Sequence, residues 1–220
     1  MEKNNMLKAV IFDLDGVITD SAKFHYLAWK SLADEFGISF DEEYNEKLKG
    51  VSRMDSLDLI LQKGNIMLPL EEKEVLADRK NGLYKEYIKQ ITPKDVLPGI
   101  ENFLQELKSE DIKMAIASAS KNAFFIIKQL GMEDCFDYIV DAGKIERSKP
   151  FPDVFLAAAE AVGVLPKECI GVEDANSGIE AIKAAGMFAV GVGTESQMQN
   201  ADIVLSTTAE LSLAALRKYF

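Results

Sequence analysis

Two carboxylates stand two positions apart, directly after a short apolar run. Asp13 and Asp15 follow residues 9–12, which are all apolar. One carboxylate of such a pair could attack an electrophile while the other transfers a proton, and the two together could bind a hard cation. A calcium loop of the DxDxDG type is excluded, because Val17 and Ile18 stand where it needs an acid and a glycine. The plain alternative is a solvated turn after a strand.

Three further motifs carry polar groups, and two of them stand at the ends of apolar runs. Residues 118–122 offer hydroxyl and backbone donors ahead of a helical pattern, Lys149 precedes a helix opened by Pro152, and Glu173 and Asp174 close another apolar run. Each alone has an ordinary interpretation as a helix cap, an exposed lysine or acidic loop residues. In this order, the motifs supply a carboxylate nucleophile, a cation site and donors for phosphoryl oxygens, which is what phosphoryl transfer needs.

The elements that must position these groups are short apolar runs alternating with helical patterns. This alternation predicts an α/β fold with a Rossmann-like, doubly wound parallel sheet as its core. Pro152 suits the first turn of a helix, and Gly163 and Gly186 suit positions just after helix ends. The expected strands are 9–12, 114–117, 138–140, 170–172, 188–190 and 203–205, and the expected helices are 99–109, 122–130, 152–162 and 177–185.

One segment interrupts this alternation. Residues 21–93 contain no apolar strand run, only helical periodicity broken by Gly37, Gly50 and Gly64. We therefore expect a small helical cap domain at 21–93, inserted into a catalytic core formed by 1–20 and 94–220, with a Pro/Gly-rich hinge at 92–99. The residues expected on the buried face of the first cap helix are Phe24, Leu27, Ala28, Leu32 and Phe36.

The composition excludes several classes of protein. The 220 residues carry a formal net charge of −11, which argues against a nucleic-acid binder. His25 is the single histidine, so sites built on two histidines are excluded. Cys135 and Cys169 have no CxxC spacing and are expected to be buried, reduced thiols. Without a signal peptide or a long apolar span, we expect a cytoplasmic monomer that does not bind membranes.

The four motifs, taken together, resemble those of the haloacid dehalogenase-like phosphotransferases. The resemblance covers essentially the whole chain, including a cap inserted after the first motif, and it implies chemistry through an aspartyl phosphate. Segments 25–29, 48–53, 79–81 and 118–122 are similar to those of the glucose-phosphate mutases of this superfamily. That similarity implies interconversion of β-D-glucose 1-phosphate and D-glucose 6-phosphate through β-glucose 1,6-bisphosphate, with Mg²⁺ as cofactor.

The resemblance also implies roles for individual residues. Asp13 would be the nucleophile and Asp15 the general acid/base, while Ser118, the Ala119 backbone and Lys149 would hold the transferring phosphoryl group. The metal would be bound by Asp13, the Asp15 carbonyl and Asp174, with Glu173 beside them. The residues implied for the second phosphate are Arg53, Ser120, Lys121 and Asn122. Those implied for cap closure and the sugar pocket are His25, Trp29, Leu48, Lys49, Gly50, Val51, Ser52 and Lys80.

Two other functions stay open beside the mutase. A phosphatase of the same superfamily would hydrolyse a small sugar phosphate, and a non-enzymatic protein could bind phosphosugars on the same fold. Intact Asp13, Asp15 and Asp174 argue against a mere binding protein, which needs no nucleophile. A mutase must also hold a second phosphate, for which Arg53 offers a bidentate fork, and exclude water, for which a cap is suited. Ser21 stands where this family often has threonine, so a hydroxyl is kept.

Overall fold

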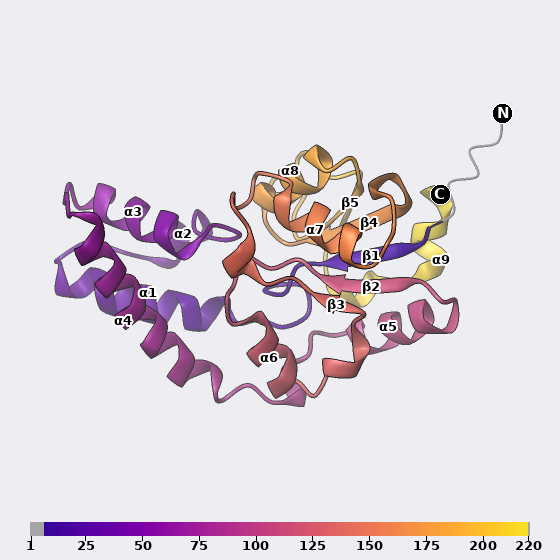
Figure 1. Cartoon of the computed structure of the whole chain (residues 1–220), viewed down its shortest axis with the longest axis horizontal. Coiled ribbons are helices and arrows are strands. Elements are labelled where there is room, and N and C mark those ends of the chain that lie inside the picture. The colour runs from indigo at the N-terminus through magenta and orange to yellow at the C-terminus, as the bar shows by residue number, and fades with distance from the viewer. Residues whose placement is uncertain (1–6, 220) are drawn as a thin grey trace.

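A computed structural model describes residues 7–219 of the chain. Its centre is a six-stranded sheet with the order β3-β2-β1-β4-β5-β6, in which all the neighbouring strands pair in parallel (Figure 1). All of the expected apolar runs are strands, with ends that differ by one or two residues, so the predicted doubly wound sheet is confirmed. The strands are β1 (Ala9–Phe12), β2 (Lys113–Ile116), β3 (Tyr138–Ile139), β4 (Cys169–Glu173), β5 (Phe188–Val192) and β6 (Ile203–Leu205).

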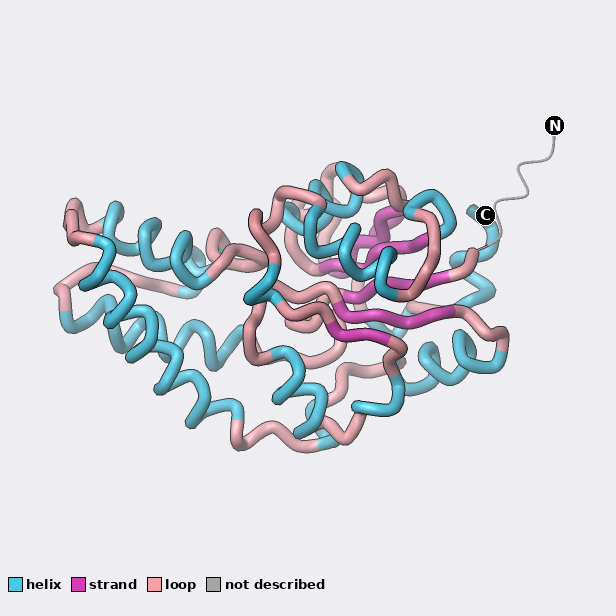
Figure 2. Tube along the Cα trace, in the orientation of Figure 1, coloured by secondary structure: helices cyan, strands magenta, loops and turns pink. Residues whose placement is uncertain are grey.

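Helices cover both faces of this sheet (Figure 2). Alternate side chains of β1 point to opposite faces, so Val10 and Phe12 join one apolar cluster while Ala9 and Ile11 join the other. Strands buried on both sides must be apolar throughout, which explains the unbroken runs in the sequence. The helices of the first cluster are α5 (Ile100–Ser109), α6 (Ala123–Gln129) and α9 (Leu213–Leu216), and those of the second are α7 (Asp153–Ala161) and α8 (Asn176–Ala184).

The segment between β1 and α5 is helical, as predicted. It lies to one side of the sheet, facing the carboxyl ends of the strands (Figure 1). Its helices share an apolar cluster of their own, which includes Trp29, Leu57 and Ile60. The division into a core at 1–20 and 94–220 and a cap at 21–93 stays a prediction. The helices are α1 (Ala22–Glu35), α2 (Glu42–Glu46), α3 (Arg53–Lys63) and α4 (Leu70–Ile88).

The buried face of α1 differs in part from the predicted one. Ala28 and Leu32 are buried as expected, but Leu27 is 47% exposed. Trp29 and Ala33 are buried instead, because α1 packs along α4 and directs these two side chains into the cluster of the cap helices. The prediction is therefore wrong at Leu27, since a helix packed on two sides buries a face different from its most regular apolar stripe.

Two chain segments connect the cap helices to the sheet and lie side by side. The Leu97 amide donates to the Ile18 carbonyl at 2.9 Å, and the Thr19 hydroxyl donates to the Asp95 carbonyl at 2.7 Å. Tyr84, although it belongs to α4, packs in the cluster on the sheet rather than in that of the cap. The connection is thus tied to the core at defined points, and a hinge at this place stays a prediction.

Smaller expectations can be compared with the structure in the same way. Gly163 and Gly186 each follow the C-cap residue of a helix, α7 and α8 respectively, as predicted. Both cysteines are free thiols, but only Cys169 is fully buried, since Cys135 is half-buried. Within residues 7–219, no helix is long and apolar enough to span a membrane.

Candidate active site

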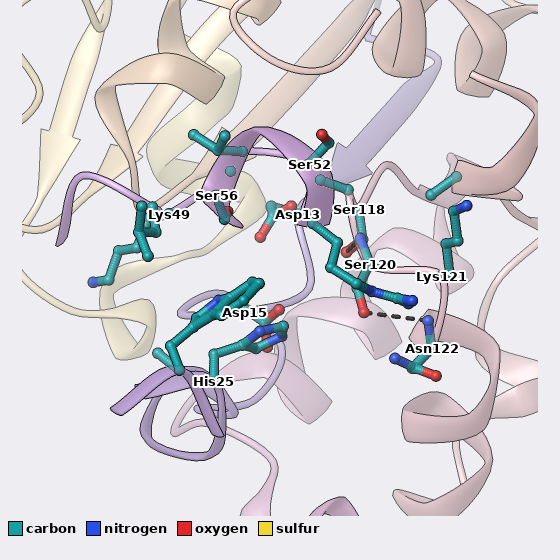
Figure 3. Close-up of a pocket in the computed structure, with 18 of the residues that line it drawn as sticks. Asp13, Asp15, His25, Lys49, Ser52, Ser56, Ser118, Ser120, Lys121 and Asn122 are labelled. Atoms are coloured by element: carbon teal, nitrogen blue, oxygen red, sulfur yellow. Dashed lines mark hydrogen bonds between the residues drawn. The ribbon is translucent and has the colours of Figure 1, made fainter. Parts of the chain in front are cut away.

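A pocket lies between the carboxyl edge of the sheet and the cap helices (Figure 3). The loops after β1, β2 and β4 form its floor, where open α/β sheets bind their ligands. Lys149 and Glu173, which were also predicted for the site, are buried beside Asp13. The predicted residues that line the pocket are Asp13, Asp15, His25, Trp29, Leu48, Lys49, Gly50, Val51, Ser52, Arg53, Lys80, Ser118, Ala119, Ser120, Lys121, Asn122 and Asp174.

A buried lysine joins two carboxylates beneath the pocket. Lys149 Nζ donates to Asp13 Oδ1 and to Glu173 Oε1, each at 2.5 Å, and its side chain is fully buried. Burial raises the pKa of Asp13 well above its usual value, although Lys149 opposes this shift. For Lys149, burial lowers the pKa but the two carboxylates outweigh it, so the net shift is upward and the side chain stays an ammonium. A fixed positive charge therefore lies next to the expected nucleophile.

Glu173 anchors this arrangement. Its Oε1 accepts from Lys149, while its Oε2 accepts from the amides of Asp174 and Ala175, both at 2.8 Å. The first turn of α8 passes so close that a Cβ on Gly178 would lie 1.8 Å from Oε1, so only glycine fits there. With both oxygens engaged, Glu173 orients Lys149 and the turn after β4.

Three carboxylates lie close enough to bind one cation. Oxygens of Asp13, Glu173 and Asp174 are within 4.8 Å of one another. Burial and the charge of Glu173 raise the pKa of Asp174 to about 7, against the opposing effect of Lys49. Clustered carboxylate oxygens are the ligands that hard divalent cations prefer. A bound cation would also offset the repulsion that contributes to the raised pKa values of Asp13 and Asp174. The donor set therefore fits a divalent metal.

Asp15 points away from that cluster. Its Oδ1 accepts a hydrogen bond from the Ser21 hydroxyl, which lies at the start of α1. Burial raises the pKa of Asp15 to about 6, although the bond from Ser21 lowers it. A carboxyl group with a pKa near neutrality can donate or accept a proton at physiological pH, as general acid/base catalysis requires.

The cap contributes basic groups to the opposite wall. Lys80 Nζ lies 2.9 Å from His25 Nδ1 and 4.3 Å from the centre of the Trp29 ring, and Lys80 is only 3% exposed. Burial, together with mutual repulsion between neighbouring basic groups, lowers the pKa values of His25 and Lys80, and burial also lowers that of Arg53. Arg53 has one distant carboxylate partner, Asp78 at 3.5 Å. This wall is suited to an anion.

Direct contacts join the cap to the core across the pocket. Lys49 Nζ lies 3.2 Å from Asp174 Oδ2, and the Ser177 hydroxyl donates to the Lys49 carbonyl at 3.1 Å. On the other side, Asn122 donates to the Asn81 side chain at 3.0 Å. The structure thus represents an arrangement in which the cap is closed on the core.

Sequence reasoning missed several pocket residues. Asn45 and Ser56 are polar and lie in cap helices, yet they are 8% and 3% exposed. Their neighbours in sequence are mostly charged or exposed, so no local pattern indicates burial; only the packing of α2 and α3 over the pocket does. The residues that line the pocket without having been predicted are Ala22, Asn45, Ser56, Asn81 and Ala142.

Comparison with known proteins gives closely similar relatives. The chain is 49% identical to the beta-phosphoglucomutase of Bacillus subtilis over 96% of this chain and 95% of that protein. It superimposes on a crystal structure of beta-phosphoglucomutase from Clostridium difficile with a TM-score of 0.95 and 48% identity, covering 97% of this chain and 96% of that one. A phosphorylated carbohydrates phosphatase of Thermotoga maritima is more distant, at 29% identity over 82% of each chain.

The family itself follows from a match to a family model. Residues 7–186 match the model of the haloacid dehalogenase-like hydrolases. This range contains all four motifs and every pocket residue described above. The chain therefore belongs to the haloacid dehalogenase-like hydrolase family.

Proposed function

We propose that this protein interconverts β-D-glucose 1-phosphate and D-glucose 6-phosphate, the activity named for its relatives in B. subtilis and C. difficile. The observation that carries the proposal is the polarity of the pocket. The carboxylates of Asp13, Glu173 and Asp174 form an acidic pole in the core, and His25, Arg53 and Lys80 form a basic pole in the cap. A bisphosphate has one phosphate for each pole, whereas a phosphatase needs only the first.

Asp13 is the nucleophile of the proposed reaction. One of its carboxylate oxygens attacks the phosphorus, forming an aspartyl phosphate as the bond from phosphorus to the sugar oxygen breaks. The leaving oxygen takes a proton from Asp15. In the second half of the cycle, Asp15 accepts the proton of the other sugar hydroxyl while that oxygen attacks the aspartyl phosphate. Asp15 therefore ends each cycle in its starting state.

Other core groups hold the transferring phosphoryl group. Lys149 stays positively charged beside Asp13, and the Ser118 hydroxyl and the Ala119 backbone line the same end of the pocket. We propose Mg²⁺ as the cation of the carboxylate cluster, bound by Asp13, Asp174 and the Asp15 carbonyl. When bound, it neutralises charge on the phosphoryl oxygens.

The cap wall binds the second phosphate. Arg53 offers a bidentate fork, and loop residues Ser120, Lys121 and Asn122 approach from the core. Because these groups belong to two elements that separate when the cap opens, a second phosphate holds the pocket closed and keeps water from the aspartyl phosphate. His25, Lys49 and Lys80 connect this closure to the sugar.

The test supplies the enzyme with Mg²⁺, β-glucose 1-phosphate and a trace of β-glucose 1,6-bisphosphate, and measures glucose 6-phosphate and free phosphate in the same samples. The expected result is glucose 6-phosphate with little free phosphate. Stoichiometric free phosphate without glucose 6-phosphate would instead assign hydrolysis of a small sugar phosphate, the activity class of the T. maritima relative. Omitting the bisphosphate should slow the start of the reaction. A monomeric state and a cytoplasmic location stay predictions.

A further inference from the structure

A chain of two buried hydroxyl groups leads from Tyr84 on α4 through Ser21 to Asp15. The Ser21 hydroxyl donates to Asp15 Oδ1, and the Tyr84 hydroxyl lies 2.9 Å from Ser21 Oγ in a buried position. The Ser120 side chain is near enough to Tyr84 to lower the pKa of its hydroxyl, against the larger effect of burial. Ser120 lies in the pocket wall, whereas neither Ser21 nor Tyr84 lines the pocket. The chain therefore passes through residues that do not touch the substrate.

The number of protons on each hydroxyl fixes which group donates and which accepts in this series of hydrogen bonds. A hydroxyl has one proton to donate and can accept two hydrogen bonds. Ser21 gives its proton to Asp15, so it accepts from Tyr84. Ser21 and Tyr84 are both fully buried, so water cannot replace either of them. All the donors point toward Asp15.

Packing holds the Tyr84 side chain in place, so its hydroxyl stays next to Ser21. It is a cap residue by sequence, on α4, but its ring packs in the apolar cluster on the sheet. The ring of His25 lies against it, with the ring centres 3.9 Å apart, and Lys80 Nζ lies 5.0 Å from its centre. The hydroxyl thus has little freedom to leave Ser21.

The consequence for Asp15 concerns its two oxygens. Oδ1 already accepts a hydrogen bond, so a proton on this carboxyl group sits on Oδ2. Within residues 7–219, no group is hydrogen-bonded to Oδ2. Oδ2 is therefore the oxygen that exchanges a proton with a molecule in the pocket.

We propose that Tyr84 is a positioning residue for the general acid/base. Through Ser21, it holds Asp15 with Oδ2 available to the sugar oxygen. The inference rests on the function proposed above for Asp15. The proposal gives a role to the Tyr84 hydroxyl, which lies outside the sequence motifs.

The test compares two phosphate donors in Tyr84→Phe, which removes only the hydroxyl. Transfer from β-glucose 1-phosphate needs a proton for the leaving oxygen, whereas release of nitrophenolate from p-nitrophenyl phosphate does not. We expect kcat for the sugar phosphate to fall about tenfold, the effect of one hydrogen bond, with a smaller change in KM. The first-turnover burst of nitrophenolate, which reports phosphorylation of Asp13, should keep its rate.

Matched variants separate positioning from packing. Tyr87→Phe removes the hydroxyl of another tyrosine of α4 that packs on the same cluster, and it should change neither rate. Ser21→Ala should reproduce the selective loss, and Ser21→Thr should restore the rate because it keeps the hydroxyl. Since Tyr84 acts through Ser21, the double variant Ser21→Ala/Tyr84→Phe should lose no more than Ser21→Ala alone.

Equal losses on both donors, no loss on either, or additive losses in the double variant would overturn the proposal. Thermal melts verify that each variant is folded. If Tyr84→Phe does not fold, the Ser21→Ala and Ser21→Thr pair decides by the same donor comparison. A wild-type enzyme that releases free phosphate without glucose 6-phosphate would overturn the mutase function only. The donor comparison would still be valid then, because hydrolysis of the sugar phosphate needs the same proton.

Discussion

The pocket has an acidic wall in the core and a basic wall in the cap, so the two walls favour counter-ions of opposite charge. In the core, Asp13, Glu173 and Asp174 crowd together, and the pKa values of Asp13 and Asp174 are raised. In the cap, the pKa values of His25 and Lys80 are lowered. The first wall is stabilised by a cation and the second by an anion. Like charges repel one another within each wall, and the proposed ligands of the reaction would reduce this repulsion in both walls.

This contrast also explains how an acidic chain can accept the phosphorylated sugars that we propose as its substrates. The net charge of −11 belongs to the chain as a whole, and it affects solubility and long-range steering. Affinity depends on local groups instead: a cation bound by the carboxylates, the fixed ammonium of Lys149 and the basic wall of the cap. Bulk charge and site charge therefore differ in sign. The predictions below disturb one wall at a time.

The largest effect is expected from the nucleophile. Asp13→Asn removes the carboxylate that we propose forms the aspartyl phosphate, so kcat should fall by about 10⁴-fold or more. Steady-state turnover and the mass increase of the enzyme after incubation with acetyl phosphate measure this. Asp20→Asn, at an exposed carboxylate after the same motif, serves as the control and should keep most of the activity. Substantial turnover by Asp13→Asn would rule out the covalent mechanism.

The next effect is on stability and concerns Lys149. Lys149→Met leaves Asp13 and Glu173 buried without their cation, so the free energy of unfolding at pH 7 without metal should fall by about 3–5 kcal/mol. Urea titration measures the change. Asp13 has a raised pKa in the folded state, so it takes up a proton more readily there as the pH falls. The deficit should therefore narrow toward pH 5.

A surface lysine provides the control for this prediction. Lys183 pairs with Asp202 at 2.6 Å, but the two side chains are 41% and 28% exposed. Lys183→Met should cost less than about 1 kcal/mol, because exposed ion pairs contribute little. Equal losses of unfolding free energy in the two variants would mean that the buried ion pairs of Lys149 contribute no more to stability than an exposed pair.

The sequence predicted the acidic wall more completely than the basic one. Asp13, Ser118 and Glu173 follow apolar runs, and parallel strands bring their carboxyl ends to one edge, so their proximity could be inferred before the fold was known. The order of the strands could not be inferred, because it depends on how the connections cross the sheet.

The cap residues needed the resemblance to a family. His25, Arg53 and Lys80 come from three different helices, and no local pattern says that these helices turn the three side chains to one pocket. Ser21 and Tyr84 are harder still, since a buried hydroxyl gives no signal in a sequence. Leu27 shows the same limit from the opposite side, since its apolar spacing predicted burial that the packing of α1 does not provide.

A moderate effect is expected from Arg53 in the basic wall. Arg53→Ala should reduce kcat/KM for β-glucose 1,6-bisphosphate by about 10- to 100-fold, the effect of losing charge-assisted hydrogen bonds. The rate of phosphorylation by p-nitrophenyl phosphate, which has no second phosphate, should change much less. Arg79→Ala, which breaks an exposed pair with Glu35 outside the pocket, is the control. Equal losses on both substrates would mean that Arg53 does not serve the second phosphate.

The smallest effect is a pH dependence that belongs to His25. Its pKa in the folded protein lies well below its ordinary value of 6.5, because burial and the charges of Lys80 and Arg53 oppose protonation. Between these two values the unfolded chain binds more protons than the folded one, so stability is complete above about pH 6.5 and falls as the pH is lowered. One such group changes the free energy of unfolding by at most about 1.4 kcal/mol per pH unit.

The matched variant for this prediction is His25→Asn. An asparagine oxygen can accept from Lys80 in place of Nδ1, but it does not titrate. At pH 7.5 the two proteins should differ little, and at pH 5.5 the variant should be more stable relative to wild type by about 1 kcal/mol. Inorganic phosphate, bound between Lys80 and Arg53, should reduce this difference, since an anion removes the repulsion that keeps His25 neutral. A stability difference that does not depend on pH or phosphate would mean that charge repulsion in the basic wall does not keep His25 neutral. Only the acidic wall would then contain groups destabilised by their neighbours.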